Sequence, residues 1–127
     1  MGLVQTMVMI ALALWSALGS MFTVPDIQVH DSSTSDNVDF REYERIWAAW
    51  TYVAEGSCVI WVPPVWQTYP AQLQQKIITH EVGHCLWLNH IEGEGIMGTG
   101  EGYELSAADR MEMWRVHPPL FRVYVPF

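Results

Sequence analysis

The sequence predicts a single α+β domain with a small, partly parallel sheet. Two short β-type segments, residues 27–29 and 58–62, flank a stretch with helical periodicity, which is the pattern of a β-α-β unit. Such a unit has parallel strands joined by a right-handed crossover. Two further helices are expected, one that starts near residues 68–70 and one that Ser106 caps, with Asp109 completing a capping box.

Length and charge limit the class of protein. The 127 residues are enough for one domain, and seven tryptophans in a half-apolar composition can build a small core. The formal charge is −8 and only six residues are Lys or Arg, which argues against a nucleic-acid partner because phosphate binding depends on these side chains. We expect a monomer.

The N-terminal stretch, residues 3–24, is apolar and has no charged side chain. The sequence Ala17-Leu18-Gly19 would allow cleavage before Ser20, so we expect residues 1–19 to be a signal peptide and residues 20–127 the mature domain. The rival interpretation is an uncleaved membrane anchor through residues 3–24. A buried core helix is disfavoured, because so small a domain has little room to enclose a helix that is apolar on all sides. Both leading interpretations predict a secreted or extracytoplasmic membrane-anchored protein.

The first clear helical pattern runs from Asp39 to Gly56. Asp39 and Glu42 form a capping-box pattern, and Gly56 is placed to end the helix. One broad face is apolar, made by Phe40, Tyr43, Trp47, Trp50 and Ala54. Residues 31–37, before this helix, are typical of a solvated loop.

The two cysteines are expected to be buried thiols. A disulfide between Cys58 and Cys85 is the alternative, which an exported protein would permit. A helix packed on a sheet usually keeps its backbone about 10 Å away, whereas a disulfide needs Cα atoms within roughly 7 Å.

Residues 80–90 hold three histidines and a glutamate at the spacing of a catalytic metal site. On a helix, His80 and His84 lie on one face and can bind one metal ion. Glu81 lies one step round the helix, where it can reach a water at the metal without being a ligand. His90 can join only if the helix stops and the chain turns back.

This segment, His-Glu-Val-Gly-His-Cys-Leu-Trp-Leu-Asn-His, resembles the zinc signature of the metzincin metallopeptidases, and among them it looks most like the matrixins. The family's motif glycine is replaced by Trp87, which must adopt left-handed geometry unless Asn89 makes the turn. Residues 96–98, Ile-Met-Gly, are similar to the family's Met-turn, and residues 105–109, Leu-Ser-Ala-Ala-Asp, are similar to the start of the matrixin C-terminal helix. The resemblance covers about residues 70–117.

The resemblance implies a minimal metzincin-like (zincin) domain and a zinc-dependent endopeptidase. His80, His84 and His90 would bind Zn²⁺, Glu81 would be the general base for a metal-activated water, and Met97 would be the Met-turn residue beneath the metal. The substrate would be a protein or peptide. If His90 does not reach the metal, the third ligand would be a downstream carboxylate; the candidates are Glu92, Glu94 and Glu104.

Two other functions stay open. One is a zinc-binding degenerate peptidase that acts as a binding module. The other is a membrane-tethered structural protein with a structural zinc. Glu81 argues against both, because a purely structural site has no use for a base beside the metal.

Overall fold

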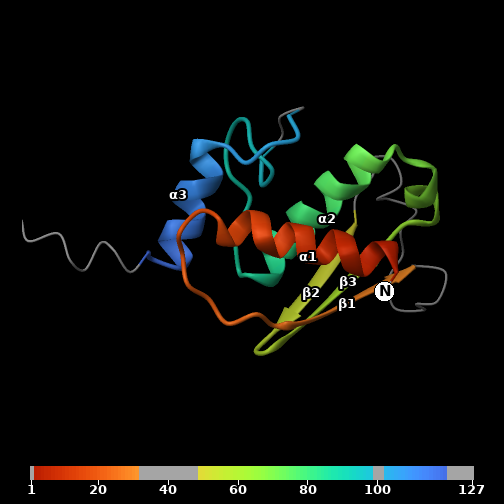
Figure 1. Ribbon diagram of the computed structural model, residues 1–127, viewed down its shortest axis with the longest axis horizontal. Helices are drawn as coiled ribbons and strands as arrows, with labels where there is room; N and C mark the ends of the chain where they lie inside the picture. Colours follow the sequence, from red (N-terminus) through yellow and green to blue (C-terminus); the bar gives the residue numbers. More distant parts are fainter. Residues whose placement is uncertain (1, 32–48, 99–101, 120–127) are drawn as a thin grey trace, which may run out of the picture.

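The computed structural model describes residues 2–31, 49–98 and 102–119, which form an α+β fold (Figure 1). In chain order the elements are α1 (Leu3–Ser16), β1 (Asp26–Asp31), β2 (Trp50–Ala54), β3 (Ser57–Val62), the short 3₁₀ helix η3 (Pro64–Thr68), α2 (Ala71–Cys85) and α3 (Ala107–Val116). Helix α2, which carries His80 and His84, follows Pro70, as predicted. The predicted capping box of Ser106 and Asp109 opens α3.

Within the described part of the chain the sheet has three strands, in the order β1-β3-β2. β1 pairs with β3 in parallel, which confirms the predicted parallel pair of strands. β2 pairs with β3 in the antiparallel direction and lies at the edge of the sheet. The sheet is therefore mixed, with β3 in its centre.

The predicted helix from Asp39 to Gly56 is wrong at its C-terminal end, where residues 50–54 form strand β2. Thr51, Tyr52 and Val53 are residue types that favour strands, and this preference prevails over the helical spacing of the apolar side chains. Gly56 has φ of +80° and lies in the tight turn between β2 and β3. Residues 32–48, with the predicted start of the helix and most of its aromatic face, lie outside the described part of the chain.

The apolar N-terminal segment forms helix α1, which packs one side against α2. Leu3, Met9, Ile10 and Leu14 stay exposed, so the domain does not enclose this helix on all sides, as expected. Met7, Ala11 and Trp15 form one buried stripe along it. The Trp15 indole Nε1 donates a hydrogen bond to the Thr79 carbonyl oxygen at 2.9 Å. No helix in the described ranges is long and apolar enough to cross a membrane. Removal of residues 1–19 by a signal peptidase stays a prediction.

Helix α2 has three faces, and each of them contacts a different part of the domain. With about 100° of rotation per residue, positions four apart share a face and adjacent positions do not. One face packs on α1, a second carries the metal-site histidines, and a third meets the sheet. Gln75, Thr79 and Gly83 lie on the face toward α1. His80 and His84 lie on the second face, and Glu81 and Cys85 lie on the face toward the sheet.

Cys58 and Cys85 form a disulfide, so the expectation of two free thiols is wrong. The face-to-face spacing of a helix and a sheet does not apply here, because Cys85 is the last residue of α2 and approaches the middle strand β3. The two Cα atoms are 5.5 Å apart, within the range that a disulfide bridges. The bond therefore ties the end of the histidine helix to the sheet.

Candidate metal centre

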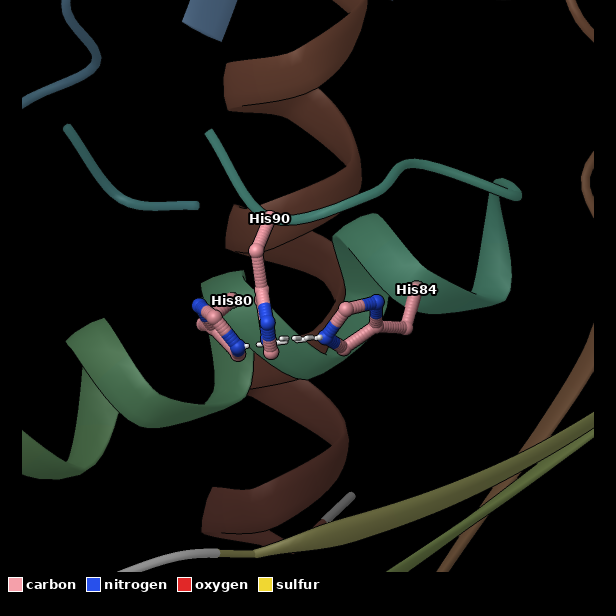
Figure 2. Close-up of side chains that lie close together, drawn as sticks. All are labelled: His80, His84 and His90. Atoms are coloured by element: carbon pink, nitrogen blue, oxygen red, sulfur yellow. Dashed lines mark hydrogen bonds between the residues drawn. The ribbon is translucent and has the colours of Figure 1, made fainter. Parts of the chain in front are cut away.

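The three histidines of the motif converge on one point (Figure 2). His80 and His84 extend from α2, and His90 comes from the loop that follows it. His84 Nε2 lies 3.2 Å from His80 Nε2 and 3.1 Å from His90 Nε2. The three possible ligand atoms all lie within 4.8 Å of one another, which is close enough to bind one metal ion.

Backbone carbonyls determine which ring nitrogen of two histidines is free. The Ile96 carbonyl lies 2.6 Å from His80 Nδ1, and the Leu88 carbonyl lies 2.9 Å from His84 Nδ1. A carbonyl oxygen only accepts, so each Nδ1 must carry the hydrogen. In the neutral rings both Nε2 atoms are then unprotonated, and two lone pairs face each other at 3.2 Å. Such an arrangement favours a cation between them.

The spacing of these nitrogens fits zinc. Tetrahedral zinc binds imidazole nitrogen at about 2.0–2.1 Å, which separates two ligand nitrogens by about 3.3–3.4 Å. The separations of 3.1 and 3.2 Å around His84 need only a small adjustment. Carbonyl acceptors on Nδ1 are also the usual outer partners of metal-bound histidine.

A tight turn after α2 brings His90 back to the other two histidines. The amide N–H of Trp87 donates to the His84 carbonyl, and that of Leu88 donates to the Gly83 carbonyl, both at 3.0 Å. These two bonds define a Schellman motif, whose pivotal residue adopts left-handed geometry and is usually glycine. Here that residue is Trp87, with φ of 69°, which costs roughly 1–2 kcal/mol. Trp87 thus makes the turn itself, and Asn89 does not take over.

Burial keeps two of the histidines in the uncharged form that binds metal. Desolvation lowers the pKa of His80 to about 4, and neighbouring His84 and His90 act in the same direction. Desolvation also lowers the pKa of His84, with a further contribution from His90. Near pH 7 both imidazoles are therefore neutral, and little proton release is needed when a metal binds.

Glu81 lies beside this group on α2 but faces the sheet. Its side chain is 5% exposed, and Thr51 Oγ1 on β2 donates a hydrogen bond to Glu81 Oε2 at 3.1 Å. Desolvation raises the pKa of Glu81 to about 7, although the bond from Thr51 acts against this. A buried carboxyl with a pKa near neutrality can both take up and release a proton.

Met97 is fully buried against α2. The residue before it, Ile96, provides the carbonyl that accepts the hydrogen bond from His80. A Cβ atom at Gly83 would lie 2.5 Å from Met97 Sδ and 3.1 Å from Trp15 Cζ2, which explains glycine in the middle of the helix. The buried Asp109 carboxylate stabilises the turn at Ile96 and Met97, because it accepts hydrogen bonds from the amide N–H groups of these two residues, at 2.7 and 2.9 Å. The cap of α3 and the turn beside the metal site thus share one carboxylate.

The structure brings together the three predicted ligands, with Glu81 and Met97 adjacent. Among the residues it describes, the candidate ligand group contains no carboxylate, so Glu92, Glu94 and Glu104 do not replace His90. Sequence reasoning missed Thr51, which fell inside the predicted helix. The run of strand-favouring residue types at Thr51, Tyr52 and Val53 was the signal for a strand.

No family model, curated protein or solved structure matches this chain.

Proposed function

We propose that this protein is a zinc-dependent endopeptidase with a minimal metzincin-like, matrixin-like domain. The observation that carries the proposal is the convergence of three imidazoles, two of them held with their Nε2 lone pairs toward one point, beside a buried glutamate. Three neutral nitrogen ligands and an open fourth position are typical of catalytic zinc, whereas structural zinc usually has four protein ligands.

In this proposal His80, His84 and His90 hold the metal. Bound zinc supplies a Lewis acid that polarises the scissile carbonyl and makes a nearby water more acidic. Glu81 takes a proton from the attacking water and then gives it to the amine that leaves when the C–N bond breaks. Burial raises the pKa of Glu81 to about 7 before a metal binds, which suits both steps, and a nearby cation would lower that pKa again.

The sheet edge offers a place for a peptide substrate. β2 is an edge strand, and Thr51 connects it to Glu81. An extended peptide that adds to such an edge binds through main-chain hydrogen bonds, which gives affinity with little dependence on sequence. We therefore expect unfolded protein or extended peptide segments as substrates.

The disulfide is compatible with a secreted or extracytoplasmic location, because such bonds persist in oxidising compartments. This location matches the expectation from the apolar N-terminus. It also fits an enzyme that acts on proteins outside the cell.

The test uses the full chain with its disulfide intact and loaded with zinc. Mass spectrometry should detect cleavage of an unfolded protein, and a chelator should abolish it. Glu81→Gln should keep zinc but lose nearly all turnover, because the amide cannot accept the proton. Glu55→Gln, at an exposed position in the turn between β2 and β3, is the matched control and should cleave like wild type. Equal cleavage by Glu81→Gln and wild type would contradict the mechanism.

The second candidate is a zinc-binding degenerate peptidase that acts as a binding module. The small sheet favours it, since the described residues contain only three strands. Bound zinc without cleavage of unfolded proteins or extended peptides would support this candidate against the peptidase.

A further inference from the structure

Thr51 makes a side-chain hydrogen bond that joins the sheet edge to the proposed base. Its Oγ1 is 3.1 Å from Glu81 Oε2. A hydroxyl can donate to a carboxylate, and a bond to an ionised acceptor is stronger than one between neutral groups. The residue is therefore placed to fix the orientation of the carboxylate.

The register of the sheet shows that Thr51 faces the helix. Thr51 lies opposite Ile60, and Val53 lies opposite Cys58, whose disulfide holds this face against α2. Side chains alternate along a strand, so the next residue, Tyr52, points to the other face and is 57% exposed. Thr51 thus points to the face that packs on α2, whereas a peptide strand would add along the edge of the sheet through main-chain hydrogen bonds.

We propose that Thr51 is a positioning residue for Glu81. Glutamate has three rotatable side-chain bonds, and a carboxylate that turns freely seldom points at the reacting water. Holding Oε2 leaves Oε1 to take the proton, and β2 is fixed to α2 through β3 and the disulfide. This inference rests on the proposed peptidase function, because it assigns Thr51 a part in the same proton transfer.

The kinetic test compares Thr51→Val, which has nearly the same shape but no hydroxyl, with Thr51→Ser, which keeps the hydroxyl. We expect kcat to fall about 10- to 100-fold in Thr51→Val, the range for losing a hydrogen bond to a charged group. KM should change less than about threefold, because the Thr51 side chain points to α2 and takes no part in main-chain hydrogen bonds at the sheet edge, and Thr51→Ser should recover most of kcat. Thr68→Val, which removes an exposed hydroxyl from η3, is the control for hydroxyl loss.

A binding test does not depend on turnover. Cobalt-loaded protein is titrated with acetohydroxamic acid, which must pass a proton to a nearby base as it chelates the metal, and binding is followed by visible absorption. Thr51→Val should raise the dissociation constant about tenfold in the wild-type background and leave it unchanged in Glu81→Gln. Thr51→Ala serves as a second variant if circular dichroism shows that Thr51→Val is unfolded.

The outcomes separate the two proposals. If acetohydroxamate binding depends on Thr51 but no peptide is cleaved, the peptidase proposal fails and the positioning role stands. If peptides are cleaved and Thr51→Val has the wild-type kcat, Thr51 does not position the base. If there is neither cleavage nor a Thr51 effect on acetohydroxamate binding, both proposals are wrong.

Discussion

Replacing Glu81 by glutamine should stabilise the metal-free protein at neutral pH, and the size of the effect follows from its pKa. Burial raises this pKa from its ordinary value of 4.5 to about 7. Between these values the folded state binds more protons than the unfolded state, so the contribution of Glu81 is fully present below pH 4.5 and is lost as pH rises through 7. A shift of about 2.5 units corresponds to about 3 kcal/mol.

In the wild-type protein this loss of stability is offset, because the pKa of His80 shifts in the opposite direction. Its pKa falls from 6.5 to about 4, so its contribution is present above pH 6.5 and is lost as pH falls through 4. Glu81→Gln removes only the first effect. The difference in free energy of unfolding between variant and wild type should therefore move by about 3 kcal/mol in favour of the variant between pH 4 and 7.5.

Urea unfolding in the presence of a chelator, with the disulfide intact, measures this difference at several pH values. All other titrating groups cancel in the comparison. Glu112→Gln is the opposite control, because the hydrogen bond from Arg115 lowers the pKa of Glu112 below 4.5. Relative to wild type this variant should lose stability as pH rises toward 4.5 and show a constant difference above about pH 5. A difference between Glu81→Gln and wild type that stays constant from pH 4 to 7.5 would refute the reasoning.

Three further variants test the supports of the site. Replacing both Cys58 and Cys85 by serine should lower the free energy of unfolding by about 3–4 kcal/mol, the loop-entropy value for their separation of 27 residues; an unchanged urea midpoint would refute this. Gly83→Ala should cost about 1–3 kcal/mol in thermal unfolding, since the methyl would press on Met97 Sδ. Asp109→Asn should lower the free energy of unfolding by about 2–3 kcal/mol, because the asparagine NH₂ group cannot accept one of the two hydrogen bonds that the carboxylate accepts. Wild-type stability in urea would show that the turn forms without the carboxylate.

The candidate metal site could largely be predicted, because it depends on residues that are close together in the sequence. The four-residue spacing of His80 and His84 determines a shared helix face. The turn to His90 is also local, although at Trp87 the sequence predicted the strained geometry only through a family resemblance. The capping box of Ser106 and Asp109 is another short-range pattern that the structure confirms.

The errors concern contacts between distant segments. Gly56 has a positive φ, which suits the end of a helix as well as a hairpin turn, and only pairing with β3 decides between them. The disulfide depended on where α2 ends relative to the sheet, which no local pattern records. Packing of α1 depended on Gly83, whose missing side chain leaves space for Trp15.

The position of Ser20 makes folding and removal of the N-terminal segment competing events. Ser20 is 6% exposed and forms a β-bridge with Pro119, and the nearby Leu18 carbonyl accepts a hydrogen bond from the Trp114 indole at 2.8 Å. A protease needs its target bond in an accessible, extended segment, so this bond is protected once the fold forms. A signal peptidase would have to cut before α1 docks, and the order of these two events would decide whether the mature chain keeps Trp15 behind the histidine helix.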